Sequence, residues 1–270
     1  MDAIEQFRKE RARRIAGNAK DARLLEASRS FLLESIRAAY SYNFDWLSRP
    51  IIQYPQDIVA MQELIWAVRP DLVIETGIAH GGSIIMSASM LAMLDYCDAL
   101  ESGEQLDPRM TRRRVLAIDV DIRSHQRAAI AAHPMSHRID MIEGSSIAAD
   151  IVAQAQERAS GYQRTLICLD SNHTHEHVLA ELEAYAPLTS VGSYCVVFDT
   201  VIADLPQEFF PHRPWGKGNN PKTAVHEYLR RLRHEGRKAA DGAALTLEID
   251  KTIDNKLLIT VAPDGYLRRT

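Results

Sequence analysis

Cysteine is scarce in this 270-residue chain, and the few present do not suggest a disulfide framework. The sequence contains three, Cys97, Cys168 and Cys195, and they show no paired spacing. Cys168 and Cys195 lie inside apolar runs that are typical of buried strands. These features favour a reducing compartment over a secreted, disulfide-stapled protein.

Long apolar runs and an excess of one charge are also missing. No stretch of about 18 consecutive apolar residues occurs, and residues 1–14 lack the apolar segment of a signal peptide. The 32 basic and 36 acidic residues give a formal charge of −4, which argues against a dedicated nucleic-acid partner. We therefore expect a cytoplasmic protein that neither inserts into a membrane nor binds nucleic acid.

The chain changes character near Pro50. Residues 1–40 are mostly charged and helix-forming, and apolar side chains recur at helical spacing between Leu32 and Tyr40. We expect residues 1–50 to form an N-terminal helical extension and cap, suited to pairing with a second subunit as a homo-oligomer, and residues 51–270 to form the main domain. Residues 41–57, rich in proline and aromatics, are predicted to be a loop that covers another part of the protein.

Short apolar runs alternate with helical segments after residue 57, and this alternation indicates the fold class. Such runs lie at 71–77, 113–121, 138–146, 164–172 and 193–200. Strands that are apolar on both faces and separated by helices predict an α/β, Rossmann-like fold with a mostly parallel sheet. Two further runs, at 244–250 and 256–262, are separated by too few residues for a helical crossover, so they are predicted to pair as antiparallel edge strands.

Acidic residues stand at the ends of four predicted strands. Ligands of parallel α/β sheets bind at the carboxyl ends of the strands, near the point where strand order reverses. One acid in such a place is equally well explained by a helix cap or a turn. Four of them at one sheet edge indicate a ligand site: Glu75, Asp119, Asp170 and Asp199.

The sequence ETGIAHGGS, residues 75–83, forms the turn from the first strand into the next helix. Glycines there allow a ligand to approach the backbone closely, and a serine helps to begin the helix. The pattern departs from the G-x-G-x-x-G of dinucleotide enzymes. It resembles the acid-x-G-x-G-x-G motif of class I methyltransferases, which bind S-adenosylmethionine, and this assigns Glu75, Gly77, Ala79, Gly81 and Ser83 to the cofactor site.

Two further segments complete the predicted cofactor site. Asp119 ends the second strand, where one carboxylate can accept hydrogen bonds from both ribose hydroxyls. The sequence EGSS follows the third strand, and its Ser145 and Ser146 are predicted to border the adenine.

Residues from about 50 to 256 resemble the cephalosporin hydroxylase and rhamnosyl O-methyltransferase family. The resemblance rests on VIETGIAHGGSIIMSASML, LAIDVDIR, LDSNHTHEHVLAELEAYAPLTSVGSY and GNNPKTAVHEYL. It implies a class I methyltransferase fold with a seven-stranded sheet. It also implies an S-adenosylmethionine-dependent O-methyltransferase that acts on a sugar hydroxyl of a surface polysaccharide, glycolipid or natural product, hence a small-molecule or glycan substrate.

The resemblance further assigns catalytic roles near the fourth and fifth strands. Related macrolide sugar O-methyltransferases carry a metal aspartate after the fourth strand and a catalytic histidine three residues later, which correspond to Asp170 and His173. A base removes the hydroxyl proton, and Mg²⁺ stabilises the emerging alkoxide. We expect Asp170 and Asp199 as the Mg²⁺ ligands. The relatives carry an acidic pair after the fifth strand, whereas Phe198 precedes Asp199 here.

The long segment 201–220 is predicted to be a binding loop or lid, because prolines, glycines and asparagines interrupt it until Pro221 begins a helix capped by Asn220. Trp215 could stack on a sugar face or simply anchor the loop by burial. The predicted substrate contacts are Trp215, Lys217, Asn219 and Lys222.

Other readings of the histidine-rich segment stay open. His173, His175, Glu176 and His177 spell H-x-H-x-E-H, which is similar to a zinc-hydrolase pattern but lacks that architecture. The helix that follows is expected to be capped by Asn172 or Thr174, with His175 and His177 in its first turn and no catalytic duty. A hydroxylase with a redox metal and a noncatalytic S-adenosylmethionine-binding protein are the alternatives to a methyltransferase.

Overall fold

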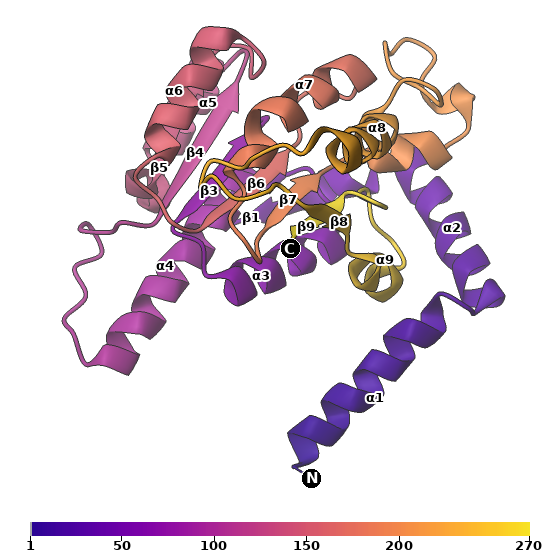
Figure 1. Ribbon diagram of the computed structural model, residues 1–270, viewed down its shortest axis with the longest axis horizontal. Helices are drawn as coiled ribbons and strands as arrows, with labels where there is room; N and C mark the ends of the chain where they lie inside the picture. Colours follow the sequence, from indigo (N-terminus) through magenta and orange to yellow (C-terminus); the bar gives the residue numbers. More distant parts are fainter. Residues whose placement is uncertain (1) are drawn as a thin grey trace.

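The computed structural model describes residues 2–270, and a seven-stranded sheet forms its centre (Figure 1). The strand order is β5-β4-β3-β6-β7-β9-β8. The parallel strands are β3 (Leu72–Thr76), β4 (Arg114–Asp119), β5 (Ile139–Glu143), β6 (Thr165–Leu169) and β7 (Tyr194–Val197). At one edge β9 (Tyr266–Arg269) runs antiparallel to β7, and β8 (Leu247–Ile249) pairs with β9. The predicted fold class is confirmed.

The strand order reverses beside β3. The chain winds from β3 through β4 to β5 on one side and then crosses to β6 and β7 on the other. In the register of the sheet, Thr76 at the end of β3 is paired with Ile118 of β4 and with Leu169 of β6. The carboxyl ends of these three strands therefore border the crevice where such folds bind ligands.

Helices cover both faces of the sheet (Figure 1). Val73 of β3 packs with α3 (Pro55–Val68) and α4 (Gly82–Ser102), whereas its neighbour Ile74 packs with α6 (Ala149–Ala159), α7 (His175–Tyr185) and α8 (Pro221–Glu235). This alternation explains why the strand sequences are apolar on both faces. Among the residues that the structure describes, α4 is the one helix with the length and apolar composition of a membrane span, and its inner side packs in the core.

Shorter elements connect these layers. They are α5 (Ser124–Ala131) and the 3₁₀ turns η2 (Pro134–Arg138), η3 (Ala186–Leu188), η4 (Thr200–Asp204) and η5 (Gln207–Phe209). The last two lie in the segment that was predicted to be irregular until Pro221. The predicted start of α8 is confirmed, because Asn220 and Thr223 form a reciprocal capping box there.

The N-terminal extension contains two helices, α1 (Ala3–Asn18) and α2 (Ala22–Arg37). None of the residues in α1 is buried, and the helix projects from the body of the protein (Figure 1). The segment predicted as a covering loop has more structure than expected. It contains η1 (Tyr40–Asn43) and a hairpin of β1 (Phe44–Trp46) and β2 (Arg49–Ile51), and the Trp46 indole donates to Ser89 Oγ of α4 over 3.0 Å.

The predicted edge strand at 256–262 is wrong. Its first two residues belong to α9 (Lys251–Leu257), a helix that begins because the Asp250 side chain accepts the Thr252 N–H over 3.0 Å. Thr260 and Val261 then turn inward to bind the carboxylate of Asp57. The antiparallel partner of β8 is instead β9, which follows at Tyr266–Arg269.

Asp57 ties this C-terminal segment to α3. The side chain is fully buried and accepts the Tyr266 hydroxyl over 2.8 Å, the Val261 N–H over 3.0 Å and the Thr260 hydroxyl. Burial raises the pKa of Asp57 to about 6, because the loss of hydration outweighs the bonds that favour its charged form.

This raised pKa predicts a pH-dependent stability. The folded state holds the Asp57 proton more tightly than the unfolded state, so this stabilising contribution is complete below the unfolded pKa and is lost as the pH rises through about 6. The loss amounts to about 1 kcal/mol between about pH 5 and about pH 7, within a total of about 3 kcal/mol. Urea unfolding of the natural protein and Asp57→Asn should show this decline only in the natural protein. A constant difference between the two across this range contradicts the raised pKa.

Candidate functional site

Two adjoining cavities lie at the carboxyl ends of the strands. The first, the Gly77 cavity, has a volume of about 160 Å³ and lies among the turn after β3, the end of β4 and residues 50–53. The second, the His173 cavity, has a volume of about 460 Å³ and lies among the end of α2, the loop after β6 and the segment after β7. Five residues line both cavities: Ile52, Gln53, Ala79, Asp170 and Ser171. Ligands in the two cavities would therefore meet beside Asp170.

Gly77 allows the ends of β3 and β6 to come together. Its φ is +90°, and a Cβ at this position would lie 2.2 Å from the carbonyl oxygen of Asp170. The Gly77 N–H donates to Ile118 O over 2.8 Å, and the Asp170 N–H donates to Thr76 O over 2.9 Å. Only glycine fits this turn, because a side chain would collide with the neighbouring backbone and strain its own.

Asp119 faces the Gly77 cavity from the end of β4. One of its oxygens accepts the Ile78 N–H over 2.7 Å, and the other accepts the Asp121 N–H over 3.1 Å. These bonds fix the carboxylate in place. Because a carboxylate oxygen can accept more than one hydrogen bond, both oxygens can still receive a pair of neighbouring hydroxyl groups.

Four of the eight predicted cofactor residues line the Gly77 cavity, and the other four do not. Gly77, Ala79, Ser83 and Asp119 line the Gly77 cavity. Glu75 lies buried behind it and accepts the Ser83 hydroxyl, and burial raises the pKa of Glu75 to about 7.

The remaining three predicted cofactor residues do not line this cavity. Gly81 caps α4 with a φ of +86° and lies against Ile130. Ser145 is in the turn after β5, and its carbonyl accepts the Ala148 N–H over 2.9 Å. Ser146 is buried, with its hydroxyl 3.0 Å from His177 Nε2.

Sequence reasoning missed the other wall of the Gly77 cavity. Residues 50–53 and His80 line it, and Gly82 packs so closely that a Cβ there would lie 2.3 Å from Pro50 O. The sequence did carry a signal for this wall, since residues 41–57 were predicted to cover another part of the protein. It gave no indication of which part.

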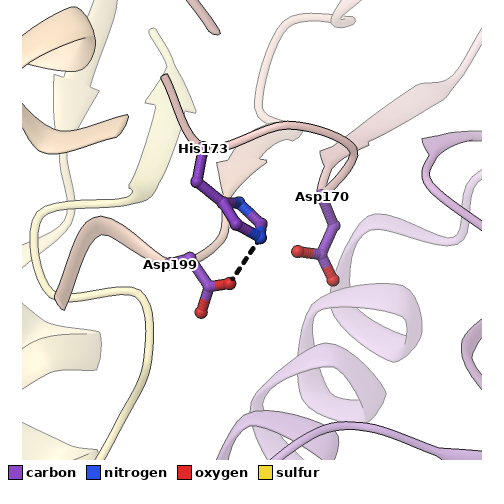
Figure 2. A group of neighbouring side chains, drawn as sticks. All are labelled: Asp170, His173 and Asp199. Carbon is purple, nitrogen blue, oxygen red and sulfur yellow. Dashed lines mark ion pairs between the residues drawn. The ribbon is translucent and has the colours of Figure 1, made fainter. Parts of the chain in front are cut away.

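Three potential metal ligands converge at the border of the two cavities (Figure 2). Asp170 follows β6, His173 lies in the same loop, and Asp199 follows β7. One ligand atom from each lies within 4.8 Å of the others, and His173 Nε2 is 3.0 Å from Asp199 Oδ2. Asp199 has a φ of +54°, a conformation that aspartate tolerates better than most residues.

The electrostatics of this cluster fit a divalent cation. Desolvation raises the pKa of Asp170 well above its ordinary value, and the negative charges of Asp199 and Glu75 raise it further. A cation between the carboxylates would remove this repulsion. The carboxylates of Asp170 and Asp199 form a suitable pair of oxygen ligands for such an ion, which would keep further positions for water or substrate.

The cluster contains a single histidine, although three occur in this stretch of sequence. His175 lies 3.1 Å from Glu227, and His177 lies against Ser146. His175 and His177 lie in the first turn of α7, as predicted, and both contact neighbouring elements. Within residues 2–270, the histidines of the H-x-H-x-E-H segment do not form a zinc site. Nor do they form the triad of two histidines and a carboxylate that a hydroxylase with a redox metal would need.

Of the four predicted substrate contacts, Trp215 alone lines the His173 cavity. Its ring centre is 4.8 Å from that of His173. Lys217 lines a different cavity beside α2, and Lys222 pairs with Asp204. Other aromatic residues, which were not among the predicted substrate contacts, line the His173 cavity as well: Tyr42, Tyr54, Phe198, Phe209 and Phe210.

Asn219, the fourth predicted contact, caps α7. Its Oδ1 accepts the His175 N–H over 2.7 Å. Thr174 stands at the predicted N-cap position of α7, but its side chain makes no capping bond, and the Asn172 side chain binds Thr174 instead of the helix. The side chain that caps the start of α7 therefore comes from a residue 44 positions away in the chain.

Residues 38–270 match the family model described as Rhamnosyl O-methyltransferase/CmcI. The chain belongs to this family. It is 29% identical over 217 residues to the rhamnosyl O-methyltransferase of Mycobacterium tuberculosis (strain ATCC 25618 / H37Rv), covering 79% of this chain and 73% of that protein. It is 27% identical over 225 residues to that of Mycobacterium leprae (strain TN), covering 83% and 82%.

A solved structure of CmcI, described with Mg and SAM, has the same fold as this member of the Rhamnosyl O-methyltransferase/CmcI family. The TM-score is 0.52 at 15% sequence identity, and the match covers 85% of this chain and 77% of that chain. The family resemblance predicted from the sequence is confirmed.

Because the backbone of residue 170 lies so close to Gly77, a single methyl group added at Gly77 should strongly reduce the stability of the protein. Gly77→Ala should lower the free energy of unfolding by at least about 2 kcal/mol, because it adds both a backbone clash and an unfavourable φ. Gly161→Ala is the matched control, since a Cβ at Gly161 would meet nothing within 4 Å. Chemical denaturation of both variants measures the difference. Equal stabilities would show that the β3 and β6 ends are not held in this arrangement.

Proposed function

We propose that this chain is an S-adenosylmethionine-dependent O-methyltransferase that methylates a hydroxyl of a sugar or glycosylated acceptor. The observation that carries this proposal is the wall shared by the two cavities at Asp170. A methyl donor in the Gly77 cavity and an acceptor in the His173 cavity would meet at that wall. The rhamnosyl O-methyltransferases among its relatives support a sugar as the acceptor.

The Gly77 cavity is the donor site in this proposal. Asp119 binds the two ribose hydroxyls of S-adenosylmethionine, and the glycine turn lets the cofactor approach the backbone of residues 77–79. Ser83 at the start of α4 lines the same cavity, and buried Glu75 holds its hydroxyl.

His173 is the proposed base. Methyl transfer is an in-line displacement, so the acceptor oxygen must be aligned with the sulfonium methyl and lose its proton. The His173 imidazole takes this proton, and Asp199, 3.0 Å from Nε2, offsets the charge of the resulting imidazolium. The aromatic walls of the His173 cavity exclude water from the reacting oxygen and provide apolar faces for the sugar ring.

Asp170 and Asp199 would hold the magnesium ion, with His173 beside them. When bound, the ion supplies positive charge that stabilises the emerging alkoxide. Phe198, at the place where relatives carry a second acid, is 3% exposed and packs in the core. The segment after β7 therefore contributes one carboxylate to the ligand set.

The N-terminal extension also belongs to the acceptor site. Ile36 near the end of α2, Ala39 between α2 and η1, and Tyr42 in η1 line the His173 cavity. A hydrogen bond of 2.7 Å between the Ser35 and Tyr54 hydroxyls fastens α2 to this wall. We propose that residues 1–50 form a structural extension whose last part shapes the acceptor cavity.

Calorimetric titration with S-adenosylmethionine tests the donor site, with NAD as the control ligand. The natural protein should bind the methyl donor and not NAD. Asp119→Ala should weaken binding about 10-fold or more, because it removes the acceptor of the ribose hydroxyls. Titrations with magnesium should detect an ion that Asp170→Asn no longer binds. Failure of S-adenosylmethionine to bind with or without magnesium would refute the donor site.

Turnover of a rhamnosyl glycoside tests the base. His173→Ala should lower kcat by about 100-fold or more and change S-adenosylmethionine affinity by less than about 2-fold, since the histidine lies outside the Gly77 cavity. His234→Ala, at an exposed site near the end of α8, is the control. An unchanged kcat in His173→Ala would remove the base assignment. Donor binding without turnover of any glycoside would indicate a noncatalytic binding protein.

A further inference from the structure

We propose that Asn219 is a positioning residue that holds the Trp215 indole against the His173 imidazole and thereby sets the orientation of the base. This inference rests on the proposed role of His173. It gives Asn219 a function different from the substrate contact predicted from the sequence. We refer to the connection Asn219–Trp215–His173 as the latch.

Asn219 fixes the backbone beside both rings of the latch. Its Oδ1 accepts the N–H of His175, two residues after His173, over 2.7 Å. Its Nδ2 donates to the carbonyl of Pro214, the residue before Trp215, over 2.8 Å. One amide therefore connects the loop that carries the base to the loop that carries the indole.

The bond to His175 satisfies a group that has no local partner. The first N–H groups of a helix lack acceptors inside the helix and need a cap. The Thr174 side chain does not supply one, and Asn172 Oδ1 is already bound to the Thr174 N–H over 2.9 Å. The position of the α7 start, and of the loop before it, therefore depends on Asn219.

The loop at the other end of the latch is held firmly. The Gly216 N–H donates to Asn219 O over 2.9 Å, and the Asn219 N–H donates to Gly216 O over 3.1 Å, which closes a tight turn. The next residue, Asn220, caps α8 and donates to Gly216 O over 2.8 Å. Since α8 packs along α7, Trp215 is attached to a rigid pair of helices rather than to a free loop.

The two contacts of His173 define its orientation. The Trp215 ring meets it at an interplanar angle of 80° with centroids 4.8 Å apart, and Asp199 Oδ2 lies 3.0 Å from Nε2. An edge-to-face contact of this kind restrains rotation of the imidazole. Without it the ring can turn away from Asp199 and from the acceptor oxygen, and methyl transfer is sensitive to such misalignment.

A double-mutant cycle tests whether Asn219 acts through Trp215. Asn219→Ala and Trp215→Ala should each lower kcat about 10-fold at unchanged S-adenosylmethionine affinity, and the double variant should be no slower than Trp215→Ala alone. Asn18→Ala is the matched control, because Asn18 also donates to a backbone carbonyl, that of Asn255, but lies on α1. Additive losses of about 100-fold in the double variant, or an unchanged kcat in Asn219→Ala, would overturn the latch.

The ring contact itself is measured by NMR of the histidine side chains. The His173 signal, identified by its loss in His173→Gln, should carry a ring-current shift that Trp215→Ala removes. Asn219→Ala should move this signal to nearly the same position, and a signal that stays in place overturns the latch. Asn219→Asp retains the acceptor for the His175 N–H but loses the donor to Pro214, so it should show the same shift while α7 keeps its cap.

These experiments can refute the latch and the proposed function independently of each other. If no sugar acceptor is methylated by the natural protein, the function fails while the NMR experiment still decides whether Asn219 holds the two rings together. If methylation occurs and Asn219→Ala is as fast as the natural protein, the function stands and the latch is refuted.

Discussion

The absence of a side chain at Gly77 is the constraint on which the site depends. It lets the turn after β3 pass so close to β6 that a Cβ would overlap the Asp170 carbonyl. Asp170 is thereby placed where it lines both cavities. In the proposed function, a wider separation of the two strand ends would put backbone or solvent between the methyl donor and the acceptor, and the in-line geometry of methyl transfer would be lost.

The close packing of strand ends also concentrates negative charge. Burial raises the pKa of Glu75 to about 7, and the pKa of Asp170 is raised by desolvation and by the charge of Asp199. This arrangement costs stability, but it suits a cationic ligand. The sulfonium of S-adenosylmethionine is positively charged, whereas the product S-adenosylhomocysteine is not, so the acidic surroundings favour the donor over the product. A magnesium ion would offset the remaining repulsion.

The parallel strands could be predicted from the sequence because they are short apolar runs separated by helices. The C-terminal edge of the sheet could not, because an apolar run in that part of the sequence does not form a strand. The parallel strands alternate with helices, and three of them, β3, β6 and β7, are buried along their whole length. By contrast, residues 256–262 have the composition of a strand, but bonds from Thr260 and Val261 to buried Asp57 draw them inward. The strand that pairs with β8 is instead β9, which carries two arginines, and one of them, Arg269, is buried and paired with Asp241. A search for apolar runs misses such a strand, because the strand contains charged residues.

In the proposed function the Gly77 cavity is the donor site and the His173 cavity is the acceptor site, and the two differ in how well the sequence predicts them. Asp119, Asp170 and Asp199 stand at strand ends, so the fold alone brings them to one edge, and the glycine turn marks the donor cavity. The acceptor cavity is built from segments that no periodicity connects: the end of α2 and the loop with Trp215. Asn219 is an example, because it caps α7 from 44 residues away and no sequence motif beside that helix indicates it. Donor recognition in the proposed function thus rests mainly on backbone geometry, whereas acceptor recognition rests on side chains from segments that lie far apart in the sequence. These segments would set the selectivity among sugar acceptors.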